Sequence, residues 1–306
     1  MANENKIIAY KGFDKDFKCR GFQYEVGKTY EMDSNIAYCN RGFHACESPM
    51  EVFDYYDMLT SRFAEVEQSG KMDKEADSTK TCSSRIKIKA ELKLGEIINL
   101  GVEWLKEITS PYKTEVNNTS NDGNSAQIGS SGDYAQIGSS SYSAQIGSSG
   151  YSAKIGSSGN YAQIGSSGNS AKIGSSGNYA QIGSSGDYAQ IGSSGYSAQI
   201  GSSGDYAQIG SSGYSAKIGS SGDYAQIGSS GYYAQIGSSG KDSVIMCAGH
   251  DSKAKAAIGS WITLAEWKRI EDVWKPICVK TEQVDGKRIK ADTYYKLIDG
   301  KFKEVE

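Results

Sequence analysis

The chain has 306 residues, a net charge of −3 and 37 glycines, most of them in its middle. So small a net charge gives no strong field, and composition therefore favours neither nucleic acid nor a membrane as a partner. No apolar run approaches the roughly 20 residues that span a bilayer, and the start lacks a secretory signal. We expect a cytoplasmic protein of the host cell, or one exported by a route that leaves no N-terminal mark.

Residues 1–116 predict a compact α+β domain. The segments "RFAEVEQSG" and "SRIKIKAEL" alternate as strands do, and "GEIINLGVEWLKEI" has the pattern of an amphipathic helix. In "SPMEVFDYYDM", Ser48, Pro49 and Glu51 have the spacing of a helix N-cap, a first helical residue and a capping-box acid. A helix that begins directly after Ser48 is therefore predicted.

The amino-acid sequence of this first part resembles an uncharacterised domain of phage and prophage proteins. The resemblance is carried by "YKGFDKDFKCRGFQYEVGKTYE", "GFHACESPMEVFDYY" and "RFAEVEQSG", and it covers about a hundred residues. It implies a phage or mobile-element setting, and it brings no known activity.

Two kinds of chemistry are conceivable in the first 116 residues. Cys19, Cys39, His44 and Cys46 are residue types that bind zinc, but their C-x4-H-x-C spacing departs from the common C-x2-C knuckle. The six cysteines are spread over the two flanking regions, which favours reduced thiols over a disulfide framework. We expect packed thiols, no metal and no cofactor.

The second kind of chemistry is enzymatic. The motifs "AYKGF", "GFHAC", "FDYY" and "FAEVE" weakly resemble the strand-anchored motifs of ADP-ribosyltransferase-like folds. That resemblance implies roles for Lys11, His44, Tyr55 and Glu67, with the Glu67 carboxylate stabilising an oxocarbenium-like transition state. The same residues are also expected in a small α+β core. We therefore expect a protein that is not an enzyme and keep an ADP-ribosyltransferase-like activity as the alternative.

Residues 117–243 repeat the unit G-S-S-G-x-x-A-(Q/K)-I. The Ala-x-Ile pair occurs 13 times, from Ala126 to Ile236, always nine residues apart. Nine is not a helical period, whereas Ala and Ile two apart fit the buried face of a short strand. Two units form one coil of 18 residues, and strands of successive coils pair about 4.8 Å apart. The sequence predicts a parallel β-solenoid, with glycines where the backbone takes positive φ or turns sharply.

The variable fifth and sixth places of the unit predict columns of side chains on the solenoid. The fifth-place aspartates and the nine-residue period resemble calcium-binding β-rolls, but the aspartates occur in only some copies, so we expect no calcium. The repeat pattern A-x-I-G-x-x-S/G is also similar to the head repeats of trimeric adhesins, which leaves trimerisation open. The tyrosine column is expected to change sides between Tyr179 and Tyr188. The predicted binding residues are Tyr188, Tyr206, Tyr224, Tyr196, Tyr214, Tyr232, Gln190, Gln208 and Gln226.

Residues 244–306 begin as degenerate repeat and then change character. The larger side chains of Trp261, Ile262, Leu264 and Trp267 are expected to close the solenoid. Two Asp-Gly dipeptides, at residues 285–286 and 299–300, lie between alternating runs and predict two hairpins. The whole chain is then mainly β: a solenoid flanked by an α+β domain and a cap with β-hairpins.

The functional prediction is a non-enzymatic binding or structural protein of phage or prophage origin. Its solenoid is expected to present Tyr, Ser and Gln columns to a protein, a glycan or another copy of the chain, and to antagonise a host-defence protein. An ice-binding or virion repeat protein is the remaining alternative. DNA mimicry is disfavoured, because residues 126–236 carry four Asp and three Lys, against roughly 18 charges on duplex DNA of similar length.

Overall fold

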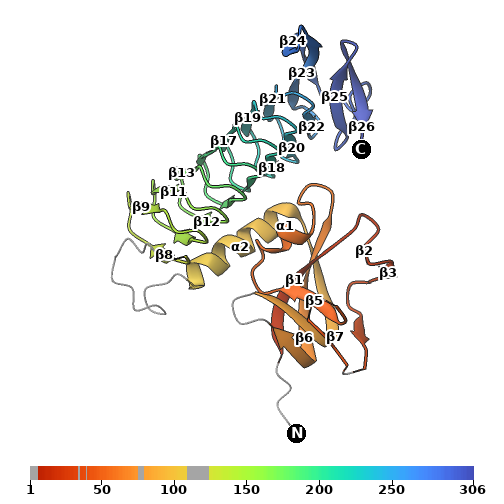
Figure 1. Cartoon of the computed structure of the whole chain (residues 1–306), viewed down its shortest axis with the longest axis vertical. Coiled ribbons are helices and arrows are strands. Elements are labelled where there is room, and N and C mark those ends of the chain that lie inside the picture. Colours follow the sequence, from red (N-terminus) through yellow and green to blue (C-terminus); the bar gives the residue numbers. More distant parts are fainter. Residues whose placement is uncertain (1–5, 34, 39, 75–78, 109–123) are drawn as a thin grey trace. The chain divides into compact units, whose positions relative to one another are not determined.

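The computed structural model describes residues 6–33, 35–38, 40–74, 79–108 and 124–306, which include both ends of every element in Figure 1. The chain divides into two compact units, Met1–Trp104 and Leu105–Glu306. The strands of the first unit are β1 (Ile7–Phe13), β2 (Lys18–Cys19), β3 (Phe22–Gln23), β4 (Thr29–Glu31), β5 (Phe43–Cys46), β6 (Arg62–Lys74) and β7 (Lys80–Leu92). Its short helix is α1 (Val52–Tyr55), and α2 (Leu94–Ile108) follows β7.

The sheet of the first unit closes on itself. Its order is β4-β7-β5-β1-β6, and β7 also pairs with β6, so β1, β5, β6 and β7 form an antiparallel ring. Buried side chains from these strands, such as Ala9, Val66 and Ile86, pack with Phe13 and Phe43 into one core. The two predicted strands correspond to β6 and β7, and the predicted amphipathic helix corresponds to α2.

The predicted capping box is wrong. The helix α1 begins at Val52, and Ser48 is fully buried with an Oγ that has no hydrogen-bond partner. The physical reason is Thr79, because its hydroxyl accepts the Ser48 N–H at 3.3 Å and donates to the Glu51 carboxylate. Both ends of the expected box are bound by a residue just before β7.

The solenoid consists of two parallel sheets that the chain enters alternately. The even-strand sheet contains β8 (Gln127–Ser130), β10 (Gln145–Ser148), β12 (Gln163–Ser166), β14 (Gln181–Ser184), β16 (Gln199–Ser202), β18 (Lys217–Ser220), β20 (Gln235–Ser238) and β22 (Lys253–Lys255). The odd-strand sheet contains β9 (Gln136–Ser139), β11 (Lys154–Ser157), β13 (Lys172–Ser175), β15 (Gln190–Ser193), β17 (Gln208–Ser211), β19 (Gln226–Ser229) and β21 (Val244–Cys247).

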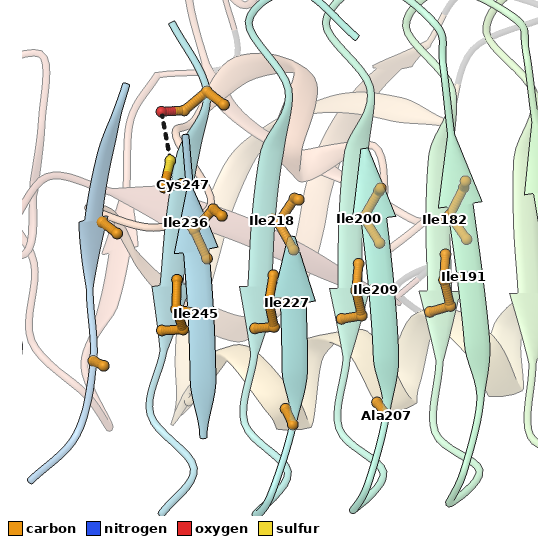
Figure 2. Close-up of a cluster of buried hydrophobic side chains, with 14 of the residues drawn as sticks. Ile182, Ile191, Ile200, Ala207, Ile209, Ile218, Ile227, Ile236, Ile245 and Cys247 are labelled. Atoms are coloured by element: carbon orange, nitrogen blue, oxygen red, sulfur yellow. Dashed lines mark hydrogen bonds between the residues drawn. The ribbon is translucent and has the colours of Figure 1, made fainter. Parts of the chain in front are cut away.

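Each strand from β8 to β20 pairs with the copy 18 residues on, as the period predicts. Ile182 pairs with Ile200 in one sheet and Ile191 with Ile209 in the other. These isoleucines are at most 3 % exposed, and the alanines two residues before them are fully buried. Figure 2 shows the isoleucine columns of the two sheets packing against each other. The aliphatic interior is therefore continuous from coil to coil.

The fourth-place glycines lie at bends as predicted, but the predicted positive φ is wrong for the glycines of the repeat. Positive φ occurs at the sixth place of the unit, for example at Tyr206 (φ 57) and Ser215 (φ 57), and the glycines of the repeat do not adopt it. At the fourth place, a Cβ added to Gly204 would lie 2.1 Å from the backbone oxygen of Gly186 in the preceding coil. Glycine is needed there because successive coils approach closely.

The fifth-place Asp and Asn residues connect successive coils. The carboxylate of Asp187 accepts the backbone N–H of Asp205 at 2.9 Å, and Asp205 accepts that of Asp223 at 2.8 Å. Asn160 and Asn178 accept in the same way, at 2.8 and 2.9 Å. The aspartate column therefore satisfies backbone donors in the turns.

The cap contains β23 (Trp261–Ile270), β24 (Val273–Gln283), β25 (Tyr294–Ile298) and β26 (Lys301–Val305). Ile262 and Leu264 are buried over the last coil as predicted, whereas Trp261 is 45 % exposed. Trp267 donates its indole N–H to the carbonyl of Ala248 at 2.9 Å.

The cap has two hairpins, and one of the two predicted turn positions is correct. Asp299 and Gly300 form the turn between β25 and β26, both with positive φ. The β23–β24 turn lies at Glu271 and Asp272 instead, which also take positive φ without a glycine. The carboxylate of Asp285 accepts three backbone N–H groups, those of residues 287–289, within the loop between β24 and β25.

Candidate functional site

The outer face of the odd-strand sheet is an exposed, regular surface. Each strand from β9 to β19 presents a Gln or Lys at its first place and a glycine two residues later, and Gln190, Gln208 and Gln226 are all exposed. These two columns line a shallow groove of about 1300 Å³ that continues to Val244 and Met246. The structure thus brings the three predicted glutamines into one column.

The glycine column of this face is not required by the fold. A Cβ added at Gly192 or Gly210 would meet no heavy atom within 4 Å, and neither residue has positive φ. Glycine in a strand is also less favourable than a residue with a side chain. The flat surface of this column leaves the backbone open to close approach by another molecule.

Two aromatic ladders follow the turns of the solenoid. Corner A denotes the turns that lead from odd to even strands, and corner B denotes the turns that lead from even to odd strands. Along corner B, the rings of Tyr188, Tyr206 and Tyr224 stack with centroids 5.0 Å apart. Along corner A, Tyr196 and Tyr214 stack at the same spacing. All of these rings are between 39 and 56 % exposed.

The sixth-place tyrosine changes sides as predicted, from corner A at Tyr179 to corner B at Tyr188, but the corner A ladder continues without a break. Its rings come from Tyr142, Tyr161, Tyr179, Tyr196, Tyr214, Tyr232, Tyr233, His250 and Trp274, with neighbouring centroids 3.9–6.2 Å apart. The tyrosine moves from the sixth place at Tyr179 to the fifth place at Tyr196, and both places lie on the same corner. The shorter corner B ladder is interrupted where Asn169 and Ser170 replace the aromatic residue.

Both kinds of ladder position are poor choices for folding alone. A sixth-place tyrosine such as Tyr206 holds φ 57, a region that disfavours bulky L-residues and that Asn or Asp enters more readily. A fifth-place tyrosine such as Tyr214 stands where Asn or Asp would accept the next coil's N–H. The stability of the coil therefore does not explain the tyrosines, which favours a role for them at the surface.

The first unit contains a second candidate site, a cavity of about 960 Å³. It is lined by β1, β5 and the segment after α1, together with residues of β2, β3 and β4. Lys11, Arg20, His44 and Lys80 contribute nitrogen groups, and the aromatic lining consists of Tyr10, Phe22, Tyr24, Phe43, Tyr30, Tyr55 and Tyr56. Glycine is required at Gly12, because an added Cβ would lie 2.3 Å from the Tyr56 ring.

Burial controls the protonation of this cavity. Burial, reinforced by the charges of Lys80 and Lys11, lowers the pKa of His44 to about 4. Burial raises the pKa of Cys46 and of Tyr55 to about 12. The Cys19 thiol lies 3.1 Å from the Tyr56 hydroxyl, where it forms a hydrogen bond. At neutral pH, His44, Cys46 and Tyr55 are therefore uncharged.

The lowered pKa of His44 predicts a pH-dependent stability. Between pH 6.5 and about 4 the unfolded chain takes up a proton at His44 and the folded chain does not, so the free energy of unfolding falls as the pH falls through this window. We expect His44→Gln to flatten the slope between pH 6.5 and 4 in urea unfolding followed at several pH values. Equal slopes for the wild-type and variant proteins would contradict this assignment.

The structure assembles part of the predicted enzymatic set. Lys11, His44 and Tyr55 all line the cavity. Glu67 does not, because it pairs with Ile8, three residues from Lys11 along β1, and therefore faces the other side of the sheet. There it forms an ion pair with Lys6 at 3.0 Å. The carboxylate assigned to the transition state is thus not brought to these three residues.

The candidate zinc ligands have mixed positions. Cys19, His44 and Cys46 line the cavity, and Cys39 lies outside the described residues. Within those residues, no group of three or more His, Cys, Asp or Glu has metal-binding geometry. Sequence reasoning did not identify Tyr56 or Lys80 as cavity residues, although the glycine of "KGF" was a signal that a ring packs against β1.

Comparison with known proteins identifies one domain. Residues 7–100 match a domain family of unknown function, DUF7666. No curated protein and no solved structure matches the chain. Within the described parts of the chain, no helix has the length and apolar character needed to cross a bilayer.

Proposed function

We propose that the protein is a non-enzymatic binding protein whose solenoid is a stiff scaffold for a contact surface. The surface consists of the odd-strand face with its glutamine and glycine columns, together with the tyrosine ladders at corners A and B. The partner is a protein. Tyrosine suits such contacts, because a large ring is buried with the loss of few rotatable bonds.

One observation carries the proposal: the tyrosines occupy positions where the fold itself favours other residues. Half-exposed rings such as Tyr206 and Tyr224 recur although serine fills the same sixth place at Ser197 and Ser215. A purely structural spacer gains little from them, since a cross-strand aromatic pair contributes only about 0.2–1 kcal/mol. Repetition of one contact group along the axis favours a partner that binds over several coils.

The biological version of the proposal is antagonism of a host-defence protein in a phage or prophage setting. The resemblance of the first hundred residues to phage domains motivates it. A stiff rod with repeated contact groups would sequester its target by occupying a long surface. Association with a second copy of the chain through the same face is the competing outcome, and light scattering at increasing concentration distinguishes the two.

Other copies of the unit show which residues can replace the ladder tyrosines without loss of the fold. We expect the triple variants Tyr188→Ser, Tyr206→Ser, Tyr224→Ser and Tyr196→Asn, Tyr214→Asn, Tyr232→Asn to keep the fold, with Tm within a few degrees of the wild type. Serine already fills the sixth place, and asparagine at the fifth place accepts the next coil's N–H. Each variant should lose at least tenfold in affinity for a protein captured from host lysate by the wild type. Undiminished capture by both variants would refute the proposal.

A further inference from the structure

Lys11 is a buried amine without a carboxylate partner. Its side chain is 4 % exposed, and its Nζ donates to the backbone carbonyl of His44 at 2.9 Å. The rings of Phe13 and Tyr56 lie 5.6 and 5.9 Å from the nitrogen. Among the described residues, no Asp or Glu forms an ion pair with Lys11. Burial lowers the pKa of this amine, because the charged form is unfavourable there, and an anion that joined it would stabilise the ammonium form.

The acidic residues of the cavity wall are occupied elsewhere. Asp14 accepts the backbone N–H groups of Asp16 and Lys18, at 3.0 and 2.7 Å. Glu31 pairs with Arg85 at 2.7 Å. Asp57 accepts the N–H groups of residues 59 and 60 at 2.9 and 3.1 Å. Among the described residues, none of these three carboxylates forms an ion pair with Lys11 or the exposed Arg20, so both groups are open to an anionic ligand.

His44 supplies a second unsatisfied group. Its Nε2 is buried without a hydrogen-bond partner. In the neutral ring a nitrogen either donates or accepts one hydrogen bond, and a hydroxyl can meet either need. A hydroxyl of a bound molecule would therefore satisfy Nε2.

Half-exposed aromatic rings also line the cavity. Phe22 and Tyr55, both among its lining residues, are 51 and 52 % exposed. The Lys80 ammonium lies 4.4 Å from the centre of the Tyr55 ring. Half-exposed rings are suited to stacking on a planar ring of a ligand, and the neighbouring cationic groups favour a separate anionic group on the same ligand.

We propose that this cavity binds a small organic anion with a planar ring and a hydroxyl group, the chemical class of the mononucleotides. The acidic group of the ligand binds Lys11 and Arg20, a hydroxyl forms a hydrogen bond with Nε2 of His44, and the ring stacks on Tyr55 or Phe22. The volume of about 960 Å³ accommodates a molecule of this size. This site is separate from the solenoid surface and does not depend on it.

The experiment uses the full chain and AMP as the probe, with adenosine and inorganic phosphate as half-probes. Calorimetric titration should show AMP binding at least tenfold more tightly than either half-probe. Lys11→Met removes the buried amine at nearly constant length. We expect it to raise the Tm of the free protein and to abolish the AMP-dependent rise in Tm. Arg20→Gln, an exposed substitution that leaves the fold intact, should weaken AMP binding about tenfold.

Each of the following results would count against the proposal. A wild-type protein that does not bind AMP overturns the proposal, as does Lys11→Met with unchanged affinity. Phosphate binding as tight as that of AMP overturns the ring contact. If Lys11→Met lowers the Tm of the free protein and Arg20→Gln leaves AMP affinity unchanged, Lys11 is a structural lysine and the proposal fails.

Discussion

Gly204→Ala is expected to destabilise the protein severely, whereas Gly210→Ala is expected to stabilise it slightly. The added Cβ at Gly204 would lie 2.1 Å from the oxygen and 2.5 Å from the carbon of Gly186, and both atoms belong to backbone that cannot move alone. The coils must separate, which weakens neighbouring hydrogen bonds such as Ser203 N–H to Ser184 O at 2.9 Å. We expect a loss of about 3 kcal/mol or more.

At Gly210 the added Cβ meets nothing within 4 Å. Replacing a strand glycine by alanine restricts the unfolded chain, so we expect a gain of about 0.5–1 kcal/mol. Urea unfolding of the two variants beside the wild type measures both effects. A second matched pair consists of Gly222→Ala at a turn glycine and Gly192→Ala at a glycine of the outer face. Similar effects at all four positions would contradict the distinction between turn glycines and face glycines.

Removal of the cap, residues 261–306, is expected to convert the protein into a polymer. The cap pairs with the last coil through β23 on β21 and β25 on β22. Its own outer strands discourage further pairing, because β24 contains Pro276 between lysines at positions 275 and 280, and β26 contains Lys301 and Lys303. Without the cap, β21 exposes backbone groups in the same register as the stack itself, which favours open-ended association.

Size-exclusion chromatography with light scattering should show the truncated chain growing in mass with concentration, while the full chain does not change in the same range. The double substitution Val244→Lys and Met246→Lys is the matched control in the truncated chain. Both side chains are about half exposed, at 51 and 53 %, so added charge acts on the edge and not on the core. A truncated chain of constant mass would show that the cap does not protect this edge.

The inward-facing pattern of the repeat was sufficient to predict the solenoid. Ala and Ile two apart and nine residues per unit leave one arrangement in which every isoleucine is hidden, and the register of Ile191 with Ile209 confirms it. The turns were harder to predict, because the fifth and sixth places are distinct columns in the sequence but occupy one corner in space. For that reason the sequence shows the sixth-place tyrosine leaving one side after Tyr179, but not that Tyr196 continues the ladder there, with the two rings 6.0 Å apart.

The cavity was predictable only in part, because it depends on contacts between distant segments. Motifs drew attention to Lys11 and His44, yet nothing local indicates that the Lys11 amine is buried against the His44 carbonyl. The resemblance to ADP-ribosyltransferase-like motifs implies that Glu67 belongs to the same site, and the sequence does not reveal its partner strand. Its pairing with Ile8 places it on the opposite face.

The central claim, an 18-residue coil stacked at the spacing of β-strands, is tested most directly by a distance between two exposed positions of the odd-strand sheet. Nitroxide amino acids at positions 136 and 226 are 90 residues apart, five coils along the axis. Pulsed electron spin resonance should give one narrow distribution near 24 Å, from five spacings of about 4.8 Å. A broad distribution centred near 50 Å, roughly that of a flexible chain of the same length, would contradict the account.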